Sequence, residues 1–147
     1  MPLPIRIEYR VTLSDVERGV DASAQLIVGQ DPEETNEHLT LRVLAWCLLY
    51  DPDLEFGPGV TDPDGADLWS HDLTGRVATW IDCGATSAEK LKRVVRHRRG
   101  ARVHVLLDDA GERERLLAEL VRARVAGVRV WLVDAALVRA LASHDER

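Results

Sequence analysis

Three acidic residues stand where local structure does not demand a charge. Glu37 lies beyond the first turn of a predicted helix, and its spacing from Leu41 and Leu44 puts it on a buried stripe of that helix. Asp67 stands where a polar loop turns into a short strand, and Asp82 ends a predicted apolar strand. Open α/β sheets place their sites at such carboxyl ends of strands. These three acids are therefore candidate site residues.

Three inward carboxylates repel one another and lose hydration, which raises their pKa values. A bound Mg²⁺ or Mn²⁺ removes that penalty, because hard divalent cations take one or two carboxylates together with water and phosphate oxygens. A shared metal site of Glu37, Asp67 and Asp82 is one interpretation, and a separate hydrogen bond for each acid is the other. Helix caps and turns explain the neighbouring acids Asp31, Glu33, Glu34, Asp51, Asp53, Asp62 and Asp64.

The helix predicted after Asp82 is basic. Lys90 and Arg93 share one of its faces, and Lys92 and Arg96 share a neighbouring face. One of these cations could reach back to the acids, where it would orient a water or stabilise charge on a phosphate. We treat all four as candidate nucleic-acid contacts, with a solvated basic surface as the alternative.

Charge is divided unevenly along the chain. Residues 31–82 hold 12 of the 25 acids and only two basic residues, whereas residues 90–129 hold 12 of the 19 Lys and Arg and five acids. The first region is suited to cations and the second to a polyanion. Both could equally be solvated surfaces of a protein whose net charge is −6.

Apolar alternation predicts a strand over 5–13 and a second over 22–29, joined as a hairpin. The segment Asp31-Pro32-Glu33-Glu34 has the composition of a helix start, which predicts a helix to about Tyr50. The elements expected after it are short strands near 54–56 and 67–70, a strand over 77–82, a helix from 86–89 to Gly100, a strand over 102–107, a helix over 111–124, a strand over 128–133 and a helix over 134–142.

The alternation of strands and helices from Val77 onward predicts parallel pairing through right-handed crossovers, and hence an α/β fold. At 147 residues the chain fits one domain. Cys47 and Cys83 have no partner at metal-site spacing, and the N-terminus shows no secretory signal. We therefore expect a cytoplasmic protein with reduced thiols and no membrane partner.

Several short motifs, taken together, resemble those of the YaeQ family of bacterial proteins. They are Pro32-Glu33-Glu34-Thr35-Asn36-Glu37 with Arg42-Val43-Leu44-Ala45, Asp67-Leu68-Trp69, Asp72-Leu73-Thr74-Gly75, and Trp80-Ile81-Asp82-Cys83-Gly84. Their order and spacing match, and the resemblance covers most of the chain.

The resemblance implies a variant of the PD-(D/E)xK nuclease fold. That fold is a restriction-endonuclease-like mixed sheet flanked by helices, here with an N-terminal β-hairpin and a core over about 31–133. In that superfamily an acid on the first core helix and acids on two strands gather around Mg²⁺. Carried over to this chain, Glu37, Asp67 and Asp82 would be the metal ligands, and Asp67 and Asp82 would also be catalytic.

The motif lysine of the superfamily lies two residues after the last acid, where this chain has Gly84. Lys90 of the following helix is our candidate for the missing amine and hence for a third catalytic residue. The leading hypothesis is a Mg²⁺- or Mn²⁺-dependent nuclease or phosphodiesterase acting on DNA or RNA. The alternatives are a non-catalytic nucleic-acid- or protein-binding regulatory module on the same fold, and a structural or regulatory protein without a site.

Overall fold

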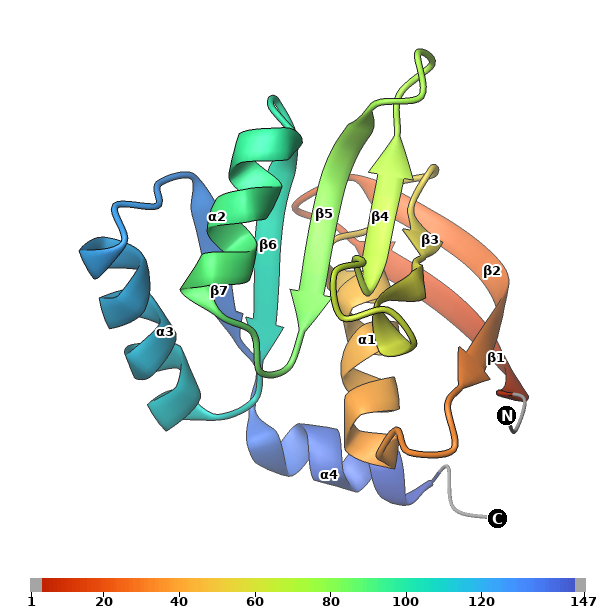
Figure 1. Ribbon diagram of the computed structural model, residues 1–147. Coiled ribbons are helices and arrows are strands. Elements are labelled where there is room, and N and C mark those ends of the chain that lie inside the picture. Colours follow the sequence, from red (N-terminus) through yellow and green to blue (C-terminus); the bar gives the residue numbers. More distant parts are fainter. Residues whose placement is uncertain (1–3, 145–147) are drawn as a thin grey trace. The chain divides into compact units, whose positions relative to one another are not determined.

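The computed structural model describes residues 4–144 (Figure 1). The chain divides into two compact units, Met1–Glu34 and Thr35–Arg147, and the single domain predicted from its length stays a prediction. The first unit is a hairpin in which β1 (Ile5–Asp15) pairs antiparallel with β2 (Val20–Gln30). Gly19 adopts φ +66° in its turn, a conformation that favours glycine. Both predicted strands are confirmed and are longer than predicted.

A five-stranded mixed sheet forms the centre of the second unit, in the order β3-β4-β5-β6-β7. Its strands are β3 (Glu55–Phe56), β4 (Leu68–His71), β5 (Val77–Cys83), β6 (Arg102–Leu107) and β7 (Val128–Leu132). A 3-10 turn, Pro58–Val60, follows β3. Pairing is antiparallel from β3 to β5 and parallel from β5 to β7. The predicted parallel pairing and the mixed α/β class are confirmed.

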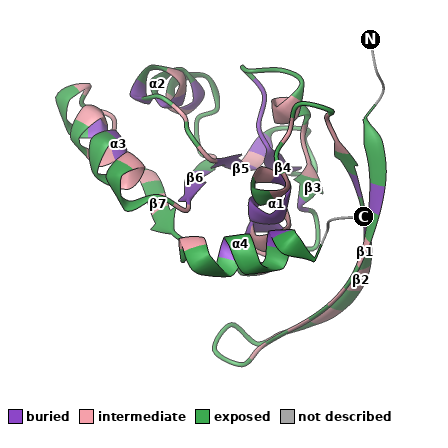
Figure 2. Ribbon diagram, turned by 90° about the horizontal axis from the view of Figure 1, so that it is seen from below, coloured by how far each residue is buried: buried purple, intermediate pink, exposed green. Residues whose placement is uncertain are grey.

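Four helices flank this sheet: α1 (Asn36–Leu48), α2 (Ala88–His97), α3 (Ala110–Arg122) and α4 (Ala135–Ser143). Figure 2 shows α2 and α3 on one face of the sheet and α1 and α4 on the other. Each helix begins after a side-chain cap that accepts backbone N–H groups, from Thr35, Ser87, Asp109 or Asp134. No helix within residues 4–144 is long and apolar enough to cross a membrane.

The core between the sheet and its α2–α3 face fixes the direction in which β5 presents its side chains. Alternate residues of β5 and β6 meet the apolar faces of both helices, and the buried cluster includes Trp80, Val103, Val105, Leu91, Val94, Leu116 and Leu120. Asp82 follows Trp80 by two residues and pairs in register with Val105. It therefore ends the row of side chains that faces α2.

Helix α1 begins later than its sequence suggests. Asp31 was the predicted cap, but its carboxylate accepts the N–H of Glu33 in a separate turn, and Thr35 caps the helix by accepting the N–H of His38. The buried face of α1 includes Leu39, Leu41, Arg42 and Ala45. Leu48 is 51% exposed, and Glu37 is exposed as well. The prediction that Glu37 lies on a buried stripe is wrong.

Candidate functional site

A buried ion pair lies at the carboxyl end of β5. The Nζ atom of Lys90, in the first turn of α2, is 3.3 Å from Oδ1 of Asp82 and donates a second hydrogen bond, 3.0 Å long, to the carbonyl oxygen of Gly65. Asp82 is 2% exposed and the Lys90 side chain is 17% exposed. The prediction that Lys90 reaches back to this acid is confirmed as a contact.

Two further donors hold the Asp82 carboxylate in place. Trp80 Nε1 donates to Oδ1 at 3.0 Å, and Thr86 Oγ1 donates to Oδ2 at 3.0 Å. A buried carboxylate needs such partners because an unpaired charge is unfavourable away from water. Together with Lys90 these bonds fix the orientation of Asp82 and leave its Oδ2 with one described donor.

Asp67 lies beside Asp82, because extending the β4–β5 register by one residue from the Leu68–Ile81 pair places the two acids opposite each other. Asp67 Oδ2 accepts the backbone N–H of Cys83 at 2.7 Å. Its Oδ1 accepts no hydrogen bond from the described residues. A Cβ atom at Gly59 would lie 2.6 Å from that oxygen and 2.7 Å from the carbonyl carbon of Ala66, so only glycine lets the backbone approach Asp67 this closely.

The electrostatic environment of Asp67 is only partly compensated. Burial raises the pKa of its carboxyl above the ordinary value, and the charge of Asp82 adds to the rise. The hydrogen bond from Cys83 and positive charge on His38 and Lys90 act in the opposite direction without cancelling it. Asp67 is thus a carboxylate that a nearby cation or a proton would stabilise.

His38 is a neighbour of the site that sequence reasoning missed. Its Nε2 is 2.9 Å from the carbonyl oxygen of Cys83 and 3.9 Å from Asp67 Oδ2. Because a carbonyl oxygen only accepts, Nε2 carries the hydrogen in this contact. His38, rather than the preceding Glu37, is the first-turn residue of α1 that turns toward the end of β5. The helical spacing 38-41-45 through the buried Leu41 and Ala45 could have indicated this.

Glu37 is not brought into this cluster as a buried ligand. It is exposed, and no group of three His, Cys, Asp or Glu side chains suited to a metal ion occurs within residues 4–144. The expectation of three inward carboxylates is therefore corrected to two, Asp67 and Asp82. The physical reason is the rotation of α1 about its axis. The predicted stripe of Glu37, Leu41, Leu44 and Leu48 does not face the core along its whole length, since Leu48 at its end is exposed.

Gly84 explains why the amine comes from a helix. Its φ is +79°, and a Cβ atom there would lie 3.2 Å from Cδ2 of His38. A lysine at this position would be strained by both its backbone conformation and that contact. Lys90, one turn into α2, supplies an amine to Asp82 without either penalty.

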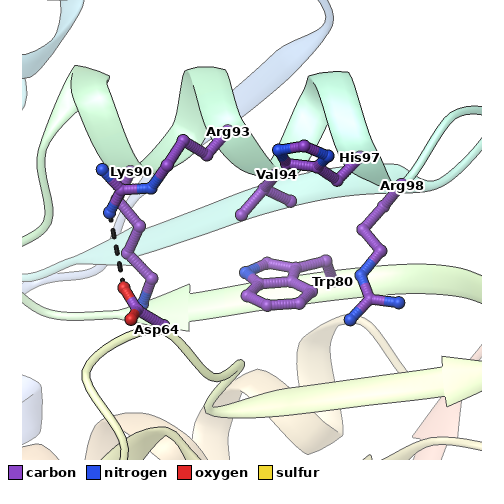
Figure 3. Close-up of a pocket in the computed structure, with 7 residues that line it drawn as sticks. All are labelled: Asp64, Trp80, Lys90, Arg93, Val94, His97 and Arg98. Atoms are coloured by element: carbon purple, nitrogen blue, oxygen red, sulfur yellow. Dashed lines mark hydrogen bonds and ion pairs between the residues drawn. The ribbon is translucent and has the colours of Figure 1, made fainter.

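A cavity extends from this ion pair between β5 and α2. This Trp80 pocket has a volume of about 290 Å³ and is lined by Asp64, Trp80, Lys90, Arg93, Val94, His97 and Arg98. In Figure 3, Trp80 lies opposite Val94 and His97, with Lys90 and Arg98 toward opposite ends. Arg93 pairs with Asp64 at 3.4 Å across one end.

A second cavity adjoins the first. This arginine pocket has a volume of about 380 Å³ and is lined by Arg76, Val77, Arg96, His97, Arg98 and Arg99. Of the four predicted nucleic-acid contacts, Lys90 and Arg93 line the Trp80 pocket and Arg96 lines the arginine pocket, while Lys92 is exposed and lines neither. Arg76 was missed because it belongs to a different element from the basic helix.

The sequence of the chain matches a known protein family over nearly its whole length. The model of the family described as "YaeQ protein" matches residues 4–147. The chain belongs to the YaeQ family. The resemblance stated from the motifs is thereby confirmed at the level of the family.

Relatives within the YaeQ family have been solved as crystal structures. The YaeQ protein of Xanthomonas axonopodis pv. citri superposes with a TM-score of 0.86 at 31% identity, covering 98% of this chain and 81% of that one. The YaeQ protein of Pseudomonas syringae gives a TM-score of 0.85 at 27% identity, covering 98% and 79%. The arrangement of elements described above is therefore the fold of this family.

The curated relatives include the YaeQ proteins of Escherichia coli (strain K12) and Salmonella typhi. Each is 29% identical over 83 residues, which is 56% of this chain and 46% of the relative. The match thus spans about half the length of those proteins. Their names state no activity, so any activity of this chain rests on its own residues.

Proposed function

We propose that this protein hydrolyses phosphodiester bonds of nucleic acid with the help of a divalent cation, on a variant of the PD-(D/E)xK fold. The observation that carries the proposal is the Asp82–Lys90 ion pair at the carboxyl end of β5, with Asp67 beside it. Two acids and an amine at the end of a central strand are the groups that such chemistry requires. Lys90, the basic member of the pair, also lines the Trp80 pocket, so its amine is the proposed point of contact for a phosphate there.

The residues present fit a cation that keeps most of its water. Mg²⁺ is commonly bound by one or two carboxylates, with water and substrate phosphate completing its shell. Asp67 Oδ1 accepts no hydrogen bond from the described residues, and burial raises the pKa of its carboxyl, so a cation beside it would be stabilising. Asp82 Oδ2 has one described donor, which leaves a lone pair available. Asp67 and Asp82 would hold the ion.

When bound, a divalent cation supplies Lewis-acid activation of water and neutralises charge on the phosphate. The chain's own residues do the rest. Lys90 uses two of its three N–H groups on Asp82 and Gly65, and the third can donate to a phosphate oxygen or orient the attacking water. Trp80 and Thr86 hold the Asp82 carboxylate in one orientation through the bonds they donate to it.

A cleavage assay tests the proposal. Labelled single-stranded DNA and RNA of one sequence are incubated with the protein in Mg²⁺, Mn²⁺ or EDTA. We expect metal-dependent cleavage that falls by about 100-fold or more in Asp67→Asn, Asp82→Asn and Lys90→Met. Trp80→Phe, which removes the donor to Asp82 and part of the buried indole that contacts Trp69, should fall by about 10- to 100-fold.

The matched controls are Lys92→Met, two residues along the same helix, and Glu37→Gln on α1. Both positions are exposed, so both variants should cleave as the wild type does. Cleavage that persists in EDTA, or that survives in Asp67→Asn, would overturn the proposal.

A second candidate function is nucleic-acid binding without cleavage. It is favoured by one observation, that Lys90 already neutralises Asp82 while two other donors bind the same carboxylate. That arrangement alone could be a structural ion pair that secures α2 to β5. On this account binding is weakened by salt and by neutralising Arg96, Arg98 and Arg99, whereas Asp82→Asn keeps binding and no variant or metal produces cleavage.

A further inference from the structure

The arginine pocket gathers four exposed arginine side chains. Arg76, Arg96, Arg98 and Arg99 all line it, and none forms an ion pair with a residue in the described part of the chain. The guanidinium of Arg98 instead lies 6.0 Å from the centre of the Trp80 ring. Exposed guanidinium groups gathered at one cavity attract anions, because each can donate charge-assisted hydrogen bonds to phosphate oxygens.

The nearest acids are already engaged elsewhere. Asp72 accepts the N–H groups of Thr74 and Arg76 and the hydroxyl of Thr74, so it serves the β4–β5 turn. Those hydrogen bonds, with the one from the Thr74 side chain foremost, lower the pKa of the Asp72 carboxyl. The charge of Arg76 also lowers this pKa, as the smallest of these effects, so Asp72 serves mainly the turn and forms no direct ion pair with the Arg76 guanidinium.

Asp64 and Glu89 are engaged as well. Both pair with Arg93, at 3.4 Å and 3.5 Å. The basic surface of α2 is thus divided in two. Its first half is neutralised around Arg93, and its last turn and the residues after it are not.

Helix electrostatics explain only part of this cluster. Cations are favoured at the C-terminus of a helix, which accounts for Arg96 in the last turn of α2. Arg76 precedes β5 and gains nothing from that helix. Two separate elements therefore bring unneutralised guanidinium groups to one cavity.

The arginine pocket shares two lining residues with the Trp80 pocket. His97 and Arg98 line both it and the Trp80 pocket, which in turn reaches Lys90. From Arg76 to Asp82 the chain advances six residues along β5, which corresponds to about 20 Å at ~3.3 Å per residue. A stacked single strand with a phosphate every ~3.4 Å would place roughly six nucleotides over that length.

We propose that the arginine pocket binds the phosphate backbone of a single-stranded nucleic acid whose adjoining segment passes through the Trp80 pocket to Lys90. The inference rests on the proposed function, since it states that the substrate is single-stranded and that the protein binds it at a second place besides the acids. A cavity of about 380 Å³ admits the backbone of one strand. A duplex would need a broad basic surface, which a chain of net charge −6 does not offer.

Equilibrium binding in EDTA tests this inference without catalysis. Fluorescence anisotropy is measured with labelled oligo(dT) of increasing length, with a duplex of the same length, and with inorganic polyphosphate as competitor. We expect the affinity to level off beyond roughly six to eight nucleotides. Arg76→Ala and Arg99→Ala should each raise Kd about 5- to 10-fold and reduce the slope of log K against log salt by about 0.7.

Arg122→Ala is the control, because that arginine is exposed on α3 and lines neither pocket. Its Kd should match that of the wild type. Unchanged binding in Arg76→Ala and Arg99→Ala, or a duplex bound as tightly as the single strand, would overturn the inference. Binding of polyphosphate without binding of any oligonucleotide would overturn it too, because the pocket would then be assigned to a free polyanion.

Failure here can be told apart from failure of the proposed function. Arg76→Ala and Arg99→Ala should raise KM for an oligonucleotide, whereas Arg122→Ala should leave cleavage of both the oligonucleotide and a small diester such as bis(p-nitrophenyl) phosphate unchanged. If cleavage is lost in Asp67→Asn but both arginine variants bind normally, the proposed role of the arginine pocket is refuted and the proposed hydrolase function stands. If the arginine variants lose binding and no form of the protein cleaves, the proposed role of the arginine pocket stands and the proposed hydrolase function is refuted.

Discussion

At the scale of single residues, the site is a small set of buried charges that are unequally satisfied. Asp82 has three side-chain donors, including the Lys90 amine. Asp67 has one backbone donor and an oxygen that no described residue engages. Buried polar groups are normally paired, so the incompletely paired Asp67 carboxylate lowers the free energy of unfolding. Such local destabilisation is common where a site must bind a charged ligand.

Asp67→Asn should therefore stabilise the protein while removing the proposed hydrolase activity. Burial raises the pKa of the folded-state Asp67 carboxyl above its unfolded value. Between those two pKa values the folded protein binds the extra proton, so stability falls as pH rises through that window, and the loss is complete above the folded pKa. Asparagine keeps an acceptor for the Cys83 N–H and carries no charge.

Urea unfolding measures this effect. We expect a gain in unfolding free energy of the order of 1 kcal/mol near neutral pH, which vanishes below the unfolded carboxyl pKa of about 3.9. Thr61→Ser, in the loop before Asp67 and at an exposed position, is a neutral control. A loss of stability in Asp67→Asn at neutral pH would show that this carboxylate is structural.

At the scale of elements, sequence patterns predict most of the fold because periodicity and caps act locally. The three parallel strands and the helices between them were predicted close to their observed bounds. The exceptions have physical causes. Thr35 rather than Asp31 caps α1, and the rotation of that helix turns His38 toward the site and leaves Glu37 in solvent. Rotation depends on tertiary packing, which a stripe of leucines does not determine.

The candidate site was predictable where it follows from the strands. Asp67 and Asp82 lie at strand ends, and the missing motif lysine directed attention to Lys90. The donors from Trp80 and Thr86 could not be foreseen, because they depend on side-chain orientation at the end of β5. Arg76 was missed for a different reason, since only the folded sheet brings it to the end of α2.

The β6–β7 pair makes its own prediction about pH. Trp131 Nε1 donates to Nδ1 of His104 at 3.0 Å, so the ring is neutral in this contact. Burial lowers the pKa of His104, and the charges of Arg129 and Arg102 lower it further. The unfolded chain therefore takes up the proton first, and the stability contributed by neutral His104 is present above about pH 6.5 and lost as pH falls through the window below it.

Urea midpoints at about pH 7.5 and about pH 5.5 test this contact. The wild type should lose stability between the two values. His104→Asn, which keeps an acceptor near Trp131 but does not titrate, should lose less. His97→Asn is the control, because His97 is exposed on α2 and lies outside the β6–β7 contact. Equal losses in wild type and His104→Asn would refute the account.

At the scale of the whole molecule, function is proposed to follow from where charge is left unneutralised. The chain is acidic overall, with a net charge of −6, yet its described cavities at β5 and α2 are lined mainly by cations. An acidic exterior repels nucleic acid, so the proposed strand would bind at these basic cavities. Lys90 lines one of them and pairs with Asp82, which lies beside Asp67.

The most direct test of this account is a calorimetric titration of the protein with Mn²⁺ at low ionic strength. The account predicts one ion bound per chain, binding lost in Asp67→Asn and Asp82→Asn, and binding retained in Glu37→Gln and Lys92→Met. Binding that persists unchanged in Asp67→Asn, or no Mn²⁺ binding by the wild type in the presence of an oligonucleotide, would contradict it.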